Sequence, residues 1–312
     1  MASATAGAAE RFVATRSSCG SVVTCSMMPE MGAQGEEGMT DVKTDVVLYE
    51  VRDRIATLTL NRPDRLNAWT GGLARRYYSL LEDAAADPDV RVIVVTGAGR
   101  GWCAGADMDS LQGGGDSDDP GAVGLDRPIW FPTTIPKPII AAINGACAGI
   151  GLCAALMCDL RFAAAGAKFT TAFVRRGLVA EHGSSWVLPR LIGHARALDL
   201  LYSGRVFLAE EAKELGVVNQ VFAPEELVDR TREYAKDLIT HCSPRSMATI
   251  KAEIYRHWNM ELAPAVKEAN ELMVRSFGFP DFKEGVQSFV QRRNPDFASL
   301  PADYEVLPKE WN

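Results

Sequence analysis

The sequence lacks any close pairing of its cysteines. The seven cysteines of the 312-residue chain include no Cys-x-x-Cys spacing, so neither a zinc site nor a disulfide framework is indicated. Three of them, Cys147, Cys153 and Cys158, lie in an apolar stretch. We therefore expect free thiols in a reducing compartment, no metal site and a cytoplasmic location.

Positive charge is also scarce. Lys and Arg number 33 against 40 Asp and Glu, and the formal net charge is −7. Nucleic-acid-binding domains usually carry a basic surface, so we expect no nucleic-acid partner. A hydrophobic content of 47% over this length is sufficient for a large core in one domain with a helical appendage.

The first 40 residues contain no secretory signal. They are rich in Ala, Ser, Gly and Met, their only basic residues are Arg11 and Arg16, and no apolar run reaches signal-peptide length. Glu10 and Glu30 disfavour a transit peptide, which is the alternative and would imply a mitochondrial location. We expect residues 1–40 to form a disordered N-terminal extension.

No uninterrupted membrane span is present. Ile139 to Cys158 carry no charge over 20 positions, a length that could cross a bilayer. The run is broken by polar and glycine residues and closed by charges, at Asn144, Gly145, Gly149, Gly151, Asp159 and Arg161. This pattern favours a buried strand over Ile139–Ile143, a glycine turn, and a buried helix that begins near Gly149.

A similar pattern precedes it at Arg91–Asp107. The apolar run Val92–Thr96 predicts a buried strand, and the small residues from Gly97 onward allow a tight turn. The spacing is not Gly-x-Gly-x-x-Gly, and no Gly-Lys-Ser/Thr follows, so both nucleotide-binding patterns are disfavoured. An ordinary strand-to-helix turn is the alternative.

Both stretches thus end a strand in a small-residue turn that starts a helix. If the two turns converge, one backbone N–H group from each can point at a single carbonyl oxygen, and the second helix adds the positive end of its dipole. Such donors suit the stabilisation of an oxyanion or enolate, and they require no side chain.

Motifs in order along the chain resemble the crotonase, or enoyl-CoA hydratase/isomerase, superfamily. The resemblance covers about residues 45–297. It is carried by Asn61-Arg62-Pro63 with Asn67-Ala68, Cys103-Ala104-Gly105-Ala106-Asp107, Lys137-Pro138, Asn144-Gly145 with Ala148-Gly149-Ile150-Gly151, Met157-Cys158-Asp159, Leu188-Pro189-Arg190-Leu191-Ile192-Gly193, and Glu284-Gly285 with Phe289, Arg292 and Arg293.

The resemblance implies an α/β fold, a crotonase-like spiral of repeated ββα units with a C-terminal helical oligomerisation region. The chain would then divide into the extension 1–40, a core over 41–240 and a helical region over 241–312. An acyl-CoA thioester is implied as substrate, with no separate cofactor. The implied assembly is a homotrimer or homohexamer that packs through the C-terminal helices.

The resemblance also implies a substrate site. The oxyanion donors would be the backbone N–H groups of Ala106 and Ile150, where the branched Ile150 replaces the usual glycine. The implied CoA-binding residues are Arg62, Arg65 and Arg100 for the phosphates, Ala104 beside adenine and pantetheine, Leu66, Ala106 and Asp107 on the same loops, and Phe289 and Arg292 from a neighbouring subunit. Asp107 is further expected to cap or brace its loop.

The acid/base positions depart from the family. Where hydratases of the family have two glutamates, this chain has Cys153 and Phe173. Addition of water needs one group that deprotonates water and one that protonates the α-carbon, so a standard hydratase is disfavoured. Cys153 lies in an apolar segment without a cationic neighbour, and we expect it to be buried and unreactive.

Glu181 is the candidate acid/base. Its position resembles the single catalytic glutamate of Δ3,Δ2-enoyl-CoA isomerases, which removes a C2 proton and returns it at C4. The apolar neighbours Leu178, Val179 and Trp186 are expected to shield its carboxylate from water. His182 is the rival acid/base and is more typical of a structural residue.

Isomerisation by Glu181 is therefore the favoured function. One alternative is an enoyl-CoA hydratase of fatty acid β-oxidation, or a related lyase or thioesterase, that uses Glu181 with water. The other is a non-catalytic acyl-CoA-binding protein, suggested by the missing glutamates and by Ile150.

The remaining elements follow from periodicity. A strand pair is expected over Val46–Val51 and Ile55–Leu60, and a helical stripe is formed by Leu73, Tyr77, Leu80, Leu81 and Ala84. Gly113–Gly121 is expected to be an acidic linker, and the resemblance implies that this segment borders the acyl pocket. The second half predicts a helix over Leu208–Leu215, a strand over Val217–Phe222, a stripe through Leu227, Thr231, Tyr234 and Leu238, a helix start at Ser243-Pro244, and a helix break at Pro264.

Overall fold

The structure, a computed structural model, describes residues 45–107 and 127–311. The described residues belong to one compact unit. The expected extension over 1–40 and the acidic linker Gly113–Gly121 lie outside the described residues, and the proposed division at residue 240 stays a prediction.

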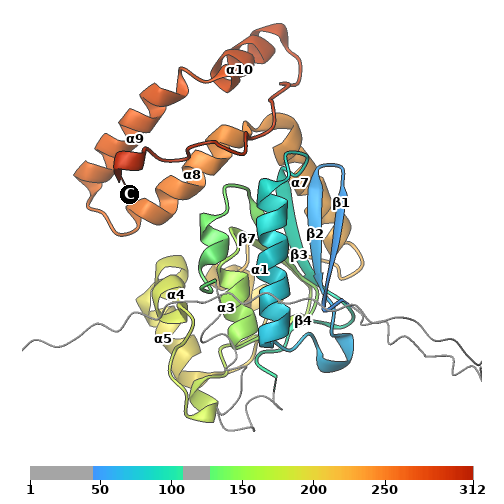
Figure 1. Cartoon of the computed structure of the whole chain (residues 1–312). Coiled ribbons are helices and arrows are strands. Elements are labelled where there is room, and N and C mark those ends of the chain that lie inside the picture. The colour runs from blue at the N-terminus through green and yellow to red at the C-terminus, as the bar shows by residue number, and fades with distance from the viewer. Residues whose placement is uncertain (1–44, 108–126, 312) are drawn as a thin grey trace, which may run out of the picture. The chain divides into compact units, whose positions relative to one another are not determined.

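Two sheets organise the described residues (Figure 1). In the larger sheet, β1 and β2 are antiparallel and every other pair is parallel. Its strands, in spatial order, are β1 (Val47–Arg52), β2 (Ile55–Leu60), β3 (Val92–Gly97), β5 (Ile139–Ile143), β7 (Leu160–Ala164) and β10 (Gln220–Phe222). The smaller sheet has β4 (Gly101–Cys103), β6 (Ala146–Ala148), β8 (Lys168–Thr170) and β9 (Phe207–Leu208).

Successive strands alternate between the sheets. β3, β5 and β7 each join the larger sheet, and the strand that follows each of them, β4, β6 or β8, joins the smaller one. Helix α3 (Ile150–Leu156) comes directly after β6 and completes a ββα unit. The expected α/β spiral is confirmed. Because β4 and β6 are parallel neighbours, the segments that follow them leave the sheet at the same edge.

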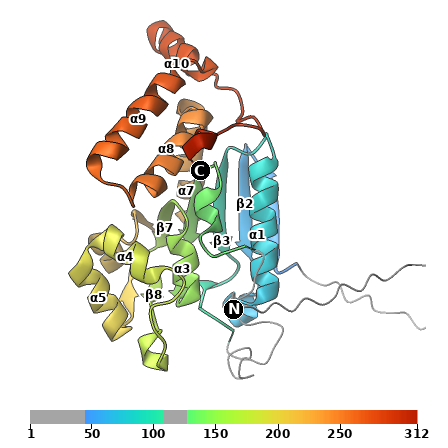
Figure 2. The ribbon, with the colours of Figure 1, turned by 60° about the vertical axis from the view of Figure 1, so that its left-hand side comes forward.

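The core lies on both faces of the larger sheet. Side chains alternate along β3, so Ile93 and Val95 pack with α1 (Gly71–Ala86), and Val92 and Val94 pack with α7 (Leu227–His241). Helix α1 runs along β2 in both ribbon views (Figures 1 and 2). Its predicted stripe is confirmed, because all five side chains are buried: Leu73, Tyr77, Leu80, Leu81 and Ala84.

The other helices occupy the second half of the chain. They are α4 (Ser184–Ile192), α5 (His194–Ser203), α6 (Ala209–Leu215), α8 (Pro244–His257), α9 (Leu262–Ser276) and α10 (Pro280–Gln291). Short 3-10 turns are η1 (Pro63–Arg65), η2 (Phe131–Thr134), η3 (Val174–Arg176) and η4 (Lys309–Trp311). No helix of the described residues is both long and apolar enough to cross a membrane.

Local signals explain several boundaries. The turn between β1 and β2 has Asp53 and Arg54 at positive φ, the conformation of a tight two-residue hairpin. Ser243 caps α8 as expected, because its hydroxyl accepts a hydrogen bond from Ser246 N at 3.1 Å, and Pro244 occupies the first turn.

Two boundaries differ from expectation. The strand predicted over Val217–Phe222 begins only at Gln220, because the N–H groups of Val217 and Val218 both donate to Ala212 O in the turn that ends α6. The helix break expected at Pro264 is also wrong. Pro264 lies in the first turn of α9, where a backbone N–H has no intrahelical partner to lose.

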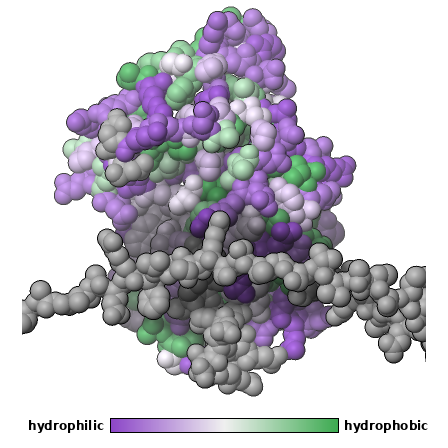
Figure 3. Space-filling model, in the orientation of Figure 1, coloured by the Kyte–Doolittle hydropathy of each residue, from purple (hydrophilic) through white to green (hydrophobic). Residues whose placement is uncertain are grey.

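The C-terminal helices expose apolar side chains. Examples on α9 and α10 are Leu262, Val274, Phe289 and Val290. Figure 3 shows apolar residues, in green, among the polar ones where Figure 1 draws these helices.

Lys251 ties α8 to the core. Its buried Nζ donates to Asp159 Oδ2 at 2.8 Å, and to the carbonyl oxygens of Pro132 and Lys137. Asp159 Oδ2 also accepts from Ile139 N at 2.7 Å, at the start of β5. The expectation that Asp159 is a structural partner beyond the buried helix is confirmed.

We predict that Lys251→Met lowers the free energy of unfolding by about 3 kcal/mol, because it leaves a partly buried carboxylate and two carbonyls without their donor. Denaturant unfolding measures this. Lys267→Met is the matched control, because the Lys267–Glu271 pair is exposed and its loss should cost less than about 0.5 kcal/mol. Equal losses in the two variants would contradict the anchoring role.

Candidate active site

The first candidate donor lies in the turn after β4. Trp69 N donates to Gly105 O at 2.8 Å, and Asp107 N donates to Trp69 O at 3.0 Å, which makes Trp69 and Ala106 a parallel bridge. In such a bridge the backbone groups of the middle residue point to the opposite side. The Ala106 N–H group therefore points away from Trp69, and it has no hydrogen-bond partner among the described residues.

A buried amide holds this turn. The Asn67 side chain accepts from Arg62 N at 2.7 Å and donates to Ala98 O at 3.0 Å and to Gly101 O at 2.7 Å. Asn67 and Leu66 both have positive φ, and Leu66 O accepts from Ala104 N at 3.1 Å. The loop over 62–67 is thereby fixed against the end of β3 and against β4.

Arg62 and Asp107 brace the same loop. Arg62 Nη2 donates to Asp107 Oδ2 at 2.8 Å, and Nη1 donates to Ala68 O at 2.6 Å. The Asp107 side chain is buried, and that of Arg62 is largely so. Asp107 thus makes the bracing contact expected of it. The guanidinium in this ion pair belongs to Arg62, which the resemblance implied as a partner of a CoA phosphate.

The second candidate donor lies at the start of α3. Gly149 turns the chain at φ +50 and donates from its N–H to Thr170 O at 3.0 Å. Ile150 is the first helical residue, where an N–H has no intrahelical partner, and none is found for it elsewhere in the described part of the chain. The side chain of Ile150 is buried.

The two turns are in direct contact. A Cβ added to Gly151 would lie 2.3 Å from Cys103 O, and one added to Gly105 would lie 3.3 Å from Ala148 O. Gly105 also has φ +111, which side chains rarely adopt. The turns that carry the two N–H groups thus converge because glycines allow their backbones to approach.

Glu181 lies beside α3. Its carbonyl oxygen accepts from Ser184 N at 3.0 Å, from Ser184 Oγ at 2.7 Å and from the Cys153 thiol at 3.6 Å. Its carboxylate lies 3.2 Å from His182 Nε2, and its side chain is 33% exposed. The residue is therefore held by its backbone against the helix that begins at Ile150.

Of the two hydratase positions, Cys153 contacts Glu181, and Phe173 lies near the turn at Gly149. Burial raises the pKa of the Cys153 thiol to about 12, so the thiol is protonated and unreactive, as expected. The Phe173 ring is buried, and a Cβ on Gly149 would be 3.8 Å from it. The expected shielding of Glu181 by Leu178 and Val179 is wrong, because both side chains are exposed.

The remaining CoA candidates lie at the surface. Arg65 is exposed at the end of η1, after β2, Arg100 is exposed between β3 and β4, and Ala104 is partly exposed. Phe289 is 85% exposed on α10, and Arg292 ends that helix at φ +56. Figure 1 draws α10 and β4 at opposite ends of the ribbon, so the helix that carries these two residues lies away from the turn after β4.

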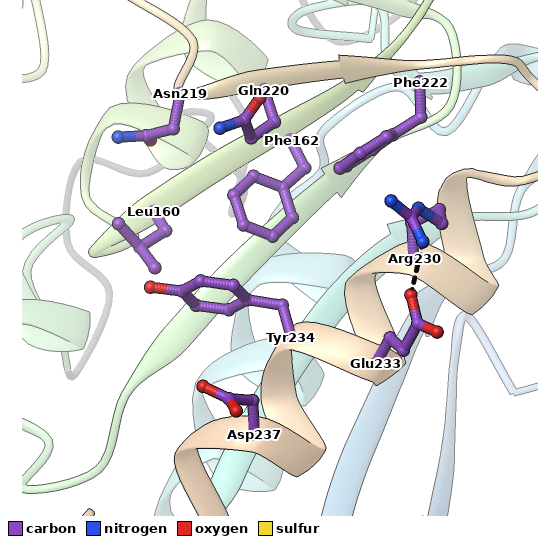
Figure 4. Close-up of a pocket in the computed structure, with 9 residues that line it drawn as sticks. All are labelled: Leu160, Phe162, Asn219, Gln220, Phe222, Arg230, Glu233, Tyr234 and Asp237. Carbon is purple, nitrogen blue, oxygen red and sulfur yellow. Dashed lines mark hydrogen bonds and ion pairs between the residues drawn. The ribbon is translucent and has the colours of Figure 1, made fainter.

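A cavity of about 640 Å³ lies elsewhere, between α7 and the strands β7 and β10 (Figure 4). Phe162, Phe222 and Tyr234 line it, together with the ion pair between Arg230 and Glu233. None of the residues predicted for catalysis or for CoA lies on its walls. The described residues include no group of three or more side chains placed to hold a metal ion.

Comparison with known proteins gives consistent matches. The family model for enoyl-CoA hydratase/isomerase matches residues 50–300. A 1,2-epoxyphenylacetyl-CoA isomerase of Escherichia coli (strain K12) is 34% identical over 260 residues, which is 81% of this chain and 98% of that protein.

Two solved structures are also similar. An enoyl-CoA hydratase from Mycobacterium marinum is 55% identical with a TM-score of 0.59, and the match covers 68% of this chain and 97% of that one. A probable enoyl-CoA hydratase/isomerase from Mycobacterium abscessus is 31% identical with a TM-score of 0.74, and the match covers 81% and 99%.

The sequence did not indicate the contacts that two side chains, Asn67 and His182, make in the site. Asn67 was included only as part of a motif, although an isolated Asn after a proline turn is a residue that tolerates positive φ and bonds to nearby backbone. The sequence shows only that His182 and Glu181 are adjacent. Adjacent side chains meet only in particular backbone conformations, so adjacency alone did not predict their contact.

We predict that Gly151→Ala destabilises the protein by about 1–3 kcal/mol, because the added methyl forces the two turns apart. Turnover should fall about tenfold or more as the donors separate. Thermal unfolding and steady-state rates measure the two effects. Gly72→Ala, whose Cβ would meet only Thr70 Oγ1 at 3.9 Å, is the control and should leave both unchanged or slightly raise stability. Unchanged turnover in Gly151→Ala would contradict the role of the close approach.

Proposed function

Since the chain belongs to the enoyl-CoA hydratase/isomerase family, we propose that it isomerises 3-enoyl-CoA thioesters to 2-enoyl-CoA thioesters with Glu181 as the acid/base. The observation that carries this proposal is the replacement at the two hydratase positions. A protonated thiol and a phenyl ring stand there, whereas the Glu181 backbone is hydrogen-bonded to that same thiol.

The proposed reaction moves one proton. The Glu181 carboxylate removes a proton from C2, and the electron pair of the C–H bond delocalises onto the thioester oxygen to give a dienolate. The N–H groups of Ala106 and Ile150 would donate to that oxygen. Glu181, now a carboxylic acid, returns the proton at C4. The double bond then lies between C2 and C3, and the carboxylate is regenerated.

The E. coli relative is named as an isomerase of an epoxyphenylacetyl-CoA thioester, so isomerisation of a CoA thioester is a reaction named among the similar proteins. Hydration is the second candidate, because other relatives are named as enoyl-CoA hydratases. In that case Glu181 would have to activate water and deliver a proton without a second carboxylate. That double demand on one group is why we favour isomerisation.

For the substrate, we propose that CoA lies along the loops at 65–66 and 100–107. The exposed Arg65 and Arg100 would meet its phosphates, while Arg62 would keep the loop in place through Asp107. Phe289 and Arg292 would reach the CoA of a neighbouring subunit. The exposed apolar side chains of α9 and α10 support such a homotrimer or homohexamer.

We predict that Glu181→Gln lowers kcat for a 3-enoyl-CoA substrate by about a thousandfold, because the amide cannot accept the C2 proton. The assay follows the absorbance of the conjugated thioester as it forms. Glu233→Gln, the same change at an exposed glutamate on α7, is the control and should keep the wild-type rate. Wild-type enzyme that leaves the 3-enoyl substrate unchanged and consumes the 2-enoyl substrate would indicate hydration instead.

We also predict that Arg100→Met raises KM for CoA substrates about tenfold with kcat within about twofold, because one charge-assisted phosphate contact is lost. Arg75→Met removes an equally exposed charge on α1 and should change neither parameter. A KM unchanged by Arg100→Met would exclude this residue from the CoA site.

A further inference from the structure

His182 adopts a backbone conformation that most side chains avoid. Its φ is +53, and the next residue, Gly183, has φ +77. Together they form the tight turn that returns the chain to Ser184, whose N–H and hydroxyl both bond to Glu181 O. A non-glycine residue keeps such a conformation where its surroundings determine it, often at functional sites.

This turn places the His182 ring against the carboxylate of its own neighbour. Nε2 lies 3.2 Å from Glu181 Oε2, and the imidazole side chain is only 19% exposed. Burial lowers the pKa of His182, against the opposing influence of Glu181, so the ring is neutral near pH 7. A neutral imidazole carries one N–H group, and with the proton on Nε2 this contact would offer a donor to the carboxylate.

Glu181 consequently has contacts at its backbone carbonyl and at its carboxylate. Ser184 and Cys153 bind its carbonyl oxygen, and His182 Nε2 contacts Oε2. None of the described residues forms a hydrogen bond or ion pair with Oε1, so we assign this oxygen to the substrate proton. Catalytic proton transfer depends strongly on such orientation, because misplacement by about 1 Å can cost about a hundredfold in rate.

We infer that His182 is a positioning residue, which fixes the Glu181 carboxylate for proton transfer by a hydrogen bond from Nε2. The inference rests on the proposed function, because it concerns the orientation of the proposed catalytic group. His182 itself exchanges no proton with the substrate in this scheme.

The test compares His182→Gln with His182→Leu. Both replacements are unbranched at Cβ and meet the same positive φ, so their backbone cost is similar. Only Gln offers an N–H donor at a reach close to that of Nε2. We expect kcat of His182→Gln within about threefold of wild type, and kcat of His182→Leu lower by about tenfold to a hundredfold, with KM changed less than twofold in both. Equal kcat in the two variants, or an effect on KM alone, overturns the inference.

Two further variants keep the test decisive. His182→Gly removes the donor without any Cβ at positive φ, so it serves if His182→Leu does not fold, and full activity in it overturns the inference. Glu181→Gln separates the two proposals. An inactive Glu181→Gln beside a fully active His182→Leu refutes only the positioning role. A fully active Glu181→Gln refutes the proposed function and the positioning role together.

Discussion

The close approach of two backbone turns is the constraint on which the candidate site depends. Parallel pairing of β4 with β6 brings the ends of both strands to one edge of the smaller sheet. Gly105 and Gly151 then allow the turns to touch, because neither position has room for a larger side chain. Two N–H groups that belong to segments more than 40 residues apart are placed together in this way. Their direction is set by backbone geometry, which makes them rigid donors.

Polar side chains around the first turn serve the same end. Asn67 and the Arg62–Asp107 pair satisfy carbonyl and N–H groups of the loop over 62–68. Trp69, which follows this loop, then pairs with Gly105 and Asp107 and leaves the Ala106 N–H unpaired among the described residues. An unpaired donor is costly unless something binds it, so its retention beside a second one supports a ligand oxygen as the natural partner.

Elements with a strong local pattern could be predicted from the sequence. The apolar runs at Val92–Thr96 and Ile139–Ile143 gave correct strands, and the stripe on α1 gave the correct buried face. Val217 and Val218 led to a wrong start for the strand. They lie in the turn after α6, and a buried turn can contain the same apolar residues as a strand. Whether the two turns converge could not be predicted from the sequence. Convergence depends on the pairing of strands from distant segments, and no local sequence pattern indicates that pairing. The contact of His182 with Glu181 depends on a single unusual φ and was out of reach.

The environment of Glu181 fits a group that must both take and return a proton. A permanently charged Arg or Lys at 3.2 Å would orient the carboxylate but would also favour its ionised form strongly and so weaken it as a base. A neutral imidazole would orient the same oxygen with a weaker hydrogen bond, and burial lowers the pKa of His182 and so favours the neutral ring. The Cys153 thiol beside Glu181 and the buried Phe173 ring add no second acid or base at the two hydratase positions. In the proposed reaction, Glu181 would therefore carry the proton taken from C2 and return it to C4.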